Sequence, residues 1–422
     1  MIFPARKSVY GLIAVLTLGS VFAALAGAAA RQNAQQNAHQ QNDWAELNAR
    51  VDSLYQAGNY AEALSAARQL LDFAQEKFGP ESPNVASCLN KLAVLYEEVG
   101  NLADAEPLYE RALAIRERAA GSDNPEVAAS LNNLGALYAD EGKYAQAQPL
   151  YERALAIREK SLDAKSPDLA MSFNNLAVLY DLEGREEDAL PLYERALSIR
   201  EKAFAPDNPE IAKSLVNLAG AYREQKRYSE AEPLYRRALA IDEKTFGPEE
   251  PEIATVLDDL GVVYVAEGKY DAAEPLYKRA MALAERNFAR QPLAATIFGD
   301  AADLEVAQGR YASAEPLDTR AAGILEERFG SASPRLAPLL GNLSEIYYLE
   351  GRFTESLTAL QRELQIQEKA LAADDPRLAS ILDNYAGLLL KTNHTAEAAQ
   401  AKSRADAIRA KASASASADS EN

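Results

Sequence analysis

A repeating period of 42 residues constrains the fold of this chain more than any other feature. The segment NPEVAASLNNLGALY begins at Asn124, SPDLAMSFNNLAVLY at Ser166 and NPEIAKSLVNLAGAY at Asn208, each 42 residues after the last. One proline recurs in the same register, with a single step of 41 residues before the sixth copy: Pro83, Pro125, Pro167, Pro209, Pro251, Pro292, Pro334 and Pro376. With an earlier turn at Gly58, the period gives nine repeats between Trp44 and about Ala412. Such self-similarity indicates one elongated array of stacked repeats.

Each repeat predicts two antiparallel helices. In the third repeat, Val127, Leu134 and Tyr138 share one face of a helix by their spacing, and a second stripe runs from Tyr144 to Ile157. A turn residue separates the two stripes in every repeat from the second onward: Gly100, Gly142, Gly184, Lys226, Gly268, Gly309, Gly351 and Asn393. A helix pair with one apolar face cannot bury that face alone, so consecutive pairs must stack. The sequence therefore predicts an all-α, right-handed solenoid of about nine helix pairs.

The residues at the helix ends support this assignment. Proline suits the first turn of a helix, where its missing N–H is not needed. Good N-cap residues precede six of the eight prolines: Ser82, Asn124, Ser166, Asn208, Ser333 and Asp375. Prolines also recur about one and a half turns inside the second helix: Pro107, Pro149, Pro191, Pro233, Pro275 and Pro316. Each removes a backbone hydrogen bond, so we expect a bend there.

The repeat resembles a known family. The pattern L-x-x-L-G/A-x-x-Y, then G-x-Y-x-x-A, then Y-x-x-A-L resembles the tetratricopeptide repeat. The phrases NNLGALY and GKYAQAQPLYERALAIREK, with the 42-residue period, are similar to the subtype found in kinesin light chains. The seventh repeat departs from the pattern, because Glu305 and Asp318 stand where other repeats carry tyrosine. The resemblance implies the repeat fold and a role in binding protein, but not motor binding, since the coiled coil of kinesin light chains has no counterpart here.

Both ends of the chain differ from the repeats. Residues 1–30 have a basic start at Arg6 and Lys7, an apolar stretch and the small-residue run Ala28-Ala29-Ala30, which is typical of a signal peptide cleaved after Ala30. An uncleaved membrane anchor is the alternative, because the apolar stretch is long. Residues 31–42 form a Gln/Asn-rich linker, residues 43–412 the solenoid, and residues 413–422 a Ser/Ala-rich tail that we expect to be disordered.

Composition excludes several classes of function. The net charge of −19 disfavours general binding of nucleic acid, which needs clustered Lys and Arg. The single cysteine, Cys88, excludes an internal disulfide framework, and the two histidines, His39 and His394, offer little for metal or acid–base chemistry. Cys88 falls on the apolar side of a first helix, where a small buried residue is expected. No Gly-rich phosphate loop or nucleophile motif occurs, so we predict no enzyme, no cofactor and no metal.

The best candidate for a binding site is a set of polar residues on the first helices, which line the concave side of such a stack. Asparagine recurs just before the Leu134-type position, and an amide side chain can both donate to and accept from a peptide unit. The candidate residues are Asn133, Asn175, Asn217 and Asn342, with the basic residues Lys91, Lys213 and Arg223. The alternative is that the asparagines bridge neighbouring repeats and hold the stack together.

Charge along this side is uneven. The basic residues lie in the early and middle repeats, whereas Asp258, Asp259, Asp300 and Asp303 cluster in the sixth and seventh. Such a gradient would orient a charged partner, although scattered surface charge on an acidic protein is a simpler interpretation.

Together these features predict a non-catalytic scaffold or adaptor that is exported to the periplasm or secreted. It would bind an extended segment of a partner protein on its concave face. The alternative is a structural envelope assembly factor that forms a homo-oligomer through its helical faces. Contact with a membrane is expected only through residues 1–30, if they are not cleaved.

Overall fold

The computed structural model describes residues 43–420, and every regular element in that part of the chain is helical. The predicted export segment and the Gln/Asn-rich linker lie outside the described residues. The helices fall into two compact units, with the boundary between Lys143 and Tyr144.

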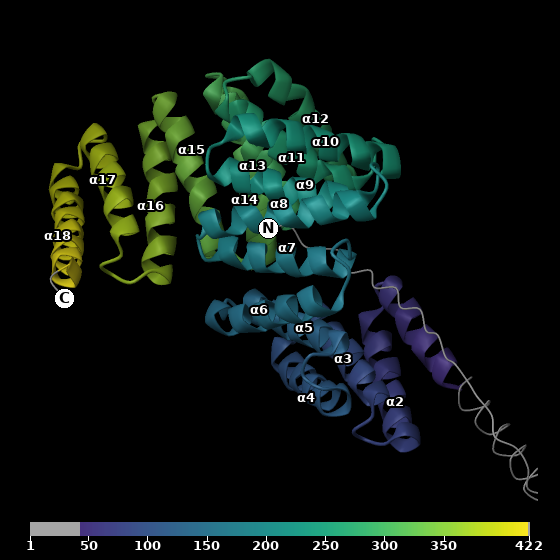
Figure 1. Cartoon of the computed structure of the whole chain (residues 1–422). Coiled ribbons are helices and arrows are strands. Elements are labelled where there is room, and N and C mark those ends of the chain that lie inside the picture. Colours follow the sequence, from purple (N-terminus) through teal and green to yellow (C-terminus); the bar gives the residue numbers. More distant parts are fainter. Residues whose placement is uncertain (1–42, 421–422) are drawn as a thin grey trace, which may run out of the picture. The chain divides into compact units, whose positions relative to one another are not determined.

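The first unit begins with helical residues 43–56. They are followed by α2 (Tyr60–Phe78), α3 (Pro83–Glu98), α4 (Leu102–Ala120) and α5 (Pro125–Asp140) (Figure 1). Helix α3 packs against both α2 and α4, and α4 packs against α5. The core of the first unit is formed mainly by small and medium-sized aliphatic side chains, and Leu70, Leu89 and Ile115 are fully buried in it.

The second unit begins with α6 (Tyr144–Ser161), α7 (Pro167–Leu182), α8 (Glu186–Ala203), α9 (Pro209–Glu224) and α10 (Tyr228–Phe246). It continues with α11 (Ala254–Ala266), α12 (Tyr270–Asn287), α13 (Pro292–Ala307) and α14 (Tyr311–Phe329). The last helices are α15 (Ala337–Leu349), α16 (Phe353–Ala370), α17 (Pro376–Lys391) and α18 (Thr395–Ser420). Helices α11 and α15 are each preceded by a 3-10 turn, at Pro251–Ile253 and Pro334–Leu336.

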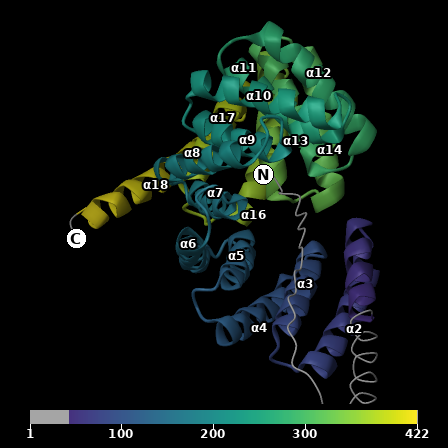
Figure 2. The ribbon, with the colours of Figure 1, turned by 45° about the vertical axis from the view of Figure 1, so that its right-hand side comes forward.

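Within each unit, the two helices of a repeat form a hairpin, as the period predicts, and consecutive hairpins pack on one another (Figure 2). The recurring proline begins the first helix, and the side chains of Asn124, Asn208 and Asp375 cap it by accepting a backbone N–H. Ser166 makes no such side-chain bond. The prolines inside the second helices lie within continuous helices, for example Pro107 in α4.

The last helix is longer than the repeat predicts. Helix α18 continues to Ser420, so the helix extends past Ala412 into the segment where we expected a disordered tail. Alanine, which alternates with serine there, has the strongest intrinsic preference for helix.

Within residues 43–420, no helix is both long and apolar enough to cross a membrane.

Candidate protein-binding surface

The first helices of the repeats lie on the inner side of the second unit. Helix α11 contacts α9 and α13 directly, although each pair belongs to different repeats. In a curved stack the elements on the inner side lie closest together, so this surface is formed by α7, α9, α11, α13, α15 and α17. The candidate residues Asn175, Asn217 and Asn342 are half-buried on these helices.

The asparagines link neighbouring repeats. The amide of Asn133 donates to Asn90 of the preceding repeat at 2.9 Å, and that of Asn217 donates to Asn174 at 2.7 Å. Asn342 makes the same kind of link, to Asp303 at 3.1 Å. Each amide still has a second N–H and an oxygen, so these bonds do not use its full capacity. The bonds match the bridging interpretation, and binding of a peptide stays a prediction.

The basic candidates already face carboxylates of this chain. Lys91 pairs with Asp52, and Lys213 pairs with Glu210 one turn earlier in α9 at 2.5 Å. Arg223 pairs with Asp259 of the next repeat and with Glu224. An acidic partner side chain would therefore compete with an internal carboxylate at each position.

A recurring contact supports the turn between the two helices of a repeat. Lys269 lies 5.6 Å from the centre of the Tyr264 ring and binds Glu232 of the preceding repeat at 2.7 Å. In the seventh repeat glutamate replaces the tyrosine, and Arg310 binds Glu305 at 2.5 Å instead of lying on a ring. A hollow of about 190 Å³ lies beside Glu305.

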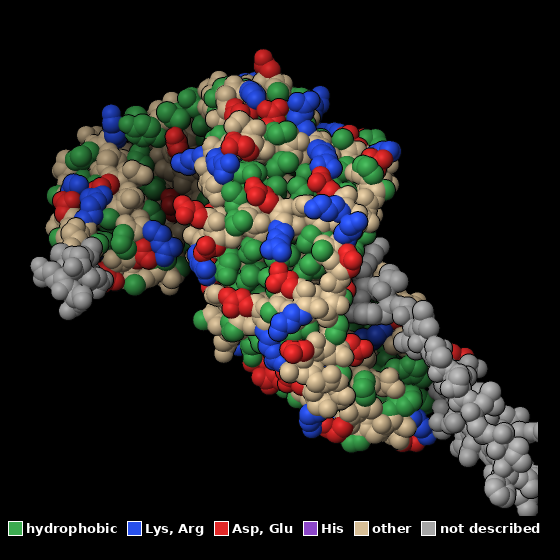
Figure 3. All heavy atoms as spheres, viewed as in Figure 1, with side chains coloured by type: hydrophobic (Ala, Val, Ile, Leu, Met, Phe, Trp, Pro, Cys, Tyr) green, Lys and Arg blue, Asp and Glu red, His purple; other side chains and the backbone are tan. Residues whose placement is uncertain are grey.

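A ladder of ion pairs connects consecutive second helices. The pairs join an arginine of one repeat to a glutamate of the preceding one: Arg195–Glu159, Arg237–Glu201, Arg279–Glu243, Arg320–Glu285, Arg362–Glu326 and Arg404–Glu368. Exposed pairs of this kind contribute little to stability individually. Basic and acidic side chains are accordingly interspersed over the face shown in Figure 3.

Two arginines are buried where a second helix packs on the next first helix. Arg158 donates to Ser172 at 2.7 Å, and Arg200 donates to Ser214 at 2.6 Å. In the following repeat the equivalent residue is Asp242, and burial raises its pKa to about 6. The buried arginine contacts therefore stop at the fifth repeat.

Buried carboxyl groups gather in the sixth to eighth repeats. Burial, followed by the charges of Asp303 and Asp300, raises the pKa of Asp318 to about 7. Burial is also the main cause that raises the pKa of Asp300 to about 6 and the pKa of Glu363 to about 7. The pKa of Asp258 is raised by burial and by the nearby Asp300. The sequence indicates an acidic cluster here, but not that Asp258 and Asp318 are buried.

Cys88 and His394 are the cysteine and the histidine in the part of the chain that the structure describes. Cys88 is buried, and the loss of solvent raises the pKa of its thiol to about 12, so it is a structural residue, as expected. His394 is exposed in the last turn between helices, beside a hollow of about 390 Å³ lined in part by Phe353 and Lys391. In the portion described by the structure, no set of three or more His, Cys, Asp or Glu residues is arranged to hold a metal ion.

Sequence reasoning did not identify the ion pairs that join consecutive second helices. Their signal is nevertheless present, because arginine and glutamate recur at fixed positions of the period, as at Arg237 and Glu201. What the period does not show is that the partner lies in the neighbouring repeat, 36 residues away.

Stacked helical hairpins with polar residues along the inner helices define a helical repeat protein of the scaffold type. The chain belongs to the tetratricopeptide repeat family, whose model matches residues 43–118, 121–202, 210–286, 265–327, 293–369 and 335–411. A comparison with curated proteins returns no match to this sequence.

Several solved structures are similar to this chain. Aspartyl phosphate phosphatase F from Bacillus subtilis is 15% identical, with a TM-score of 0.52 over 88% of this chain and 93% of that one. A putative kinesin light chain from Podosopora anserina with nearly identical TPR-like repeats is 27% identical, with a TM-score of 0.42 over 47% of this chain and 94% of that one. BtubC from P. vanneervenii is 24% identical, with a TM-score of 0.46 over 57% of this chain and 93% of that one. The match to the phosphatase, at this low identity, supports the fold alone.

Proposed function

We propose that this protein is a non-catalytic scaffold or adaptor that binds an extended segment of a partner protein on the inner surface of its repeats. The observation that carries the proposal is the recurrence of half-buried asparagines at one register of the first helices, at Asn133 in the first unit and at Asn175 and Asn217 in the second. Successive peptide units of an extended segment offer N–H and C=O groups that an amide can bind. The tetratricopeptide repeat fold, which is typical of protein-binding adaptors, supports the same function.

The test compares binding with stability. We expect Asn133→Ala, Asn175→Ala and Asn217→Ala together to weaken a micromolar partner roughly a hundredfold, because each lost hydrogen bond costs about 1 kcal/mol. The partner is the protein captured by the wild-type chain from an envelope extract, and its affinity is then measured by calorimetry. Gln361→Ala, which removes an exposed amide from a second helix, is the control.

Thermal melts of the same variants separate the two roles of the asparagines. Asn133 and Asn217 bridge repeats, so a modest fall in melting temperature is expected for both. The affinity is therefore measured well below the melting temperature of the weakest variant. Unchanged affinity together with a large fall in melting temperature would leave the asparagines a purely structural role.

We also propose that the chain is exported and acts in the periplasm or outside the cell. The basic start, apolar stretch and Ala28-Ala29-Ala30 run of the first 30 residues support export. The expected result is that protein recovered from the envelope lacks about the first 30 residues by intact mass. Full-length protein found only in detergent extracts would replace cleavage by anchoring to the membrane.

A further inference from the structure

Asp318 is a buried carboxyl group in the seventh repeat. It lies in α14 at the position where five other second helices carry tyrosine: Tyr109, Tyr151, Tyr193, Tyr235 and Tyr277. Its side chain has an exposed fraction of 0%, and in the part of the chain that the structure describes neither carboxyl oxygen has a hydrogen-bond partner. A buried polar group without a partner is costly, so this arrangement needs an explanation.

Further carboxyl groups surround Asp318 on the inner surface. After burial, the charges of Asp303 and Asp300 in α13 are the causes that raise the pKa of Asp318. Asp258 of α11 hydrogen-bonds with Asp300 and has one buried oxygen that lacks a partner among the described residues. The charge of Glu345 in α15 contributes to raising the pKa of Asp303. The side chains of Glu345 and Asp303 are both exposed. These five residues, which we call the acidic patch, come from the first helices α11, α13 and α15 and from the second helix α14.

Among the described residues, no ion pair balances the charges of the acidic patch. The positive charge of Arg223 lowers the pKa of Asp258 and of Asp300. The ion pairs of Arg223, however, are with Asp259 and Glu224. Asp303 accepts one hydrogen bond, from the neutral amide of Asn342.

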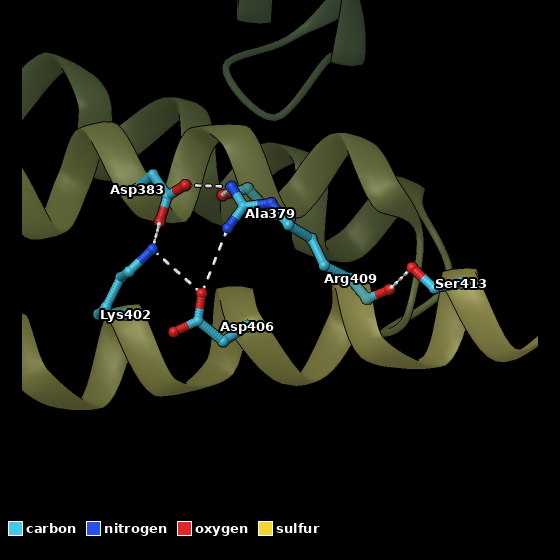
Figure 4. Close-up of polar contacts among 6 residues, drawn as sticks. All are labelled: Ala379, Asp383, Lys402, Asp406, Arg409 and Ser413. Atoms are coloured by element: carbon cyan, nitrogen blue, oxygen red, sulfur yellow. Dashed lines mark hydrogen bonds and ion pairs between the residues drawn. The ribbon is translucent and has the colours of Figure 1, made fainter.

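In the last repeat, a carboxylate at an equivalent position is paired with two cationic side chains. Asp383, which occupies the position of Asp258, binds Lys402 at 3.1 Å and also pairs with Arg409 (Figure 4). Lys402 occupies the position that Asp318 has in the seventh repeat. The same structural position thus supplies a cation in the last repeat and another acid in the seventh.

We propose that the acidic patch binds a cationic side chain, a lysine or arginine, of an extended partner segment on the inner surface. The ammonium or guanidinium group would supply the N–H donors and the positive charge that the patch lacks. Asp303 and Glu345 are exposed and would make the first contact, while Asp318 lies buried behind them. A metal ion is a poorer fit, because the patch has no arrangement of three carboxylates suited to one among the described residues. This proposal rests on the proposed function, since it assumes that a protein segment occupies this surface.

The test uses a fluorescein-labelled peptide of alternating lysine and glycine, with a glutamate–glycine peptide as its counterpart. Fluorescence anisotropy should show binding of the lysine peptide only. The double variant Asp303→Asn/Glu345→Gln should weaken this binding about tenfold or more, because two charged contacts are lost. The matched control is Glu187→Gln/Asp271→Asn, which changes the net charge equally at exposed positions on second helices and should leave the affinity within about twofold.

Several outcomes would overturn the proposal. Equal loss in the two double variants would mean that the lysine peptide responds only to the overall negative charge. Spermidine that binds the patch as tightly as the peptide would identify a free polyamine as the ligand. Circular dichroism and melting of Asp303→Asn/Glu345→Gln guard against misfolding, and asparagine at 303 retains the acceptor for Asn342.

The asparagine variants separate this proposal from the proposed function. If the lysine peptide depends on the acidic patch but the captured partner ignores Asn133, Asn175 and Asn217, the patch holds and the asparagine surface fails. If the partner depends on the asparagines but not on Asp303 and Glu345, and the lysine peptide ignores the patch as well, only the acidic patch is overturned.

Discussion

Single substitutions within the repeats differ in whether the neighbouring residues compensate for them. Glutamate at position 305 removes a tyrosine ring, and Arg310 adapts by forming an ion pair. Most repeats place an acid before the first helix and a base near the end of the second; Arg290 and Glu327 exchange these charges and still form a pair, at 3.0 Å. Asp318 has no such compensation among the residues that the structure describes. Because equivalent positions recur in every repeat, the repeats can be compared with one another at each position. A substitution that no neighbouring residue compensates for points to a partner outside the chain.

At the residue scale, Asp318→Asn should remove part of the pH dependence of stability. The pKa of Asp318 is about 7 in the folded protein against an ordinary value of 3.8, so the folded state binds its proton more tightly. Stability should therefore rise as the pH falls from about 8 toward about 4, by up to about 4 kcal/mol for this group. Asparagine has nearly the same shape but cannot ionise.

Urea unfolding across this pH range measures the effect. The wild type should be more stable at about pH 5 than at about pH 8, and the variant should show a smaller difference. Asp271→Asn, at an exposed position, is the control. An unchanged pH dependence in Asp318→Asn would show that Asp318 is not the group responsible.

At the scale of the helix, residues close in the sequence determine where each helix ends. They do not determine which contacts form between helices. Most turns between the two helices of a repeat use glycine with positive φ, such as Gly268 at 72°. Lys226 and Asn393 adopt the same left-handed conformation, with φ of 57° and 66°. Asparagine tolerates this conformation better than lysine, so Lys226 is the more strained of the two. The buried bond from Arg200 to Ser214 instead depends on how α8 lies against α9.

At the scale of the whole molecule, stability should be distributed along the array, because each helix contacts mainly its sequence neighbours. Deleting residues 167–208 removes one repeat and joins Ser166 to Pro209, which restores a normal start of a first helix. It also places the repeat of Ser214 after Arg158, where Arg158 can bond as Arg200 does now. We expect a shorter protein with the same fraction of helix and a cooperative melt.

The control removes only residues 167–184, a single first helix, and should lose helix around the deletion and melt less cooperatively, because two second helices would then follow each other. Circular dichroism and thermal melts distinguish the two proteins. Loss of helicity in the whole-repeat deletion would be incompatible with a stack of equivalent repeats.

The sequence by itself determined the helix pairs, their boundaries and the stacked architecture. These follow from short-range physics: a proline such as Pro209 starts a helix, a glycine such as Gly268 ends one, and apolar residues at helical spacing must be buried. Only the tertiary structure decided which polar groups meet. Asn217 bonds to Asn174, 43 residues away, and Asp318 loses contact with water, because the packing of neighbouring repeats sets the distance and burial of each pair. The sequence lists these polar residues, but it does not show which of them find a partner.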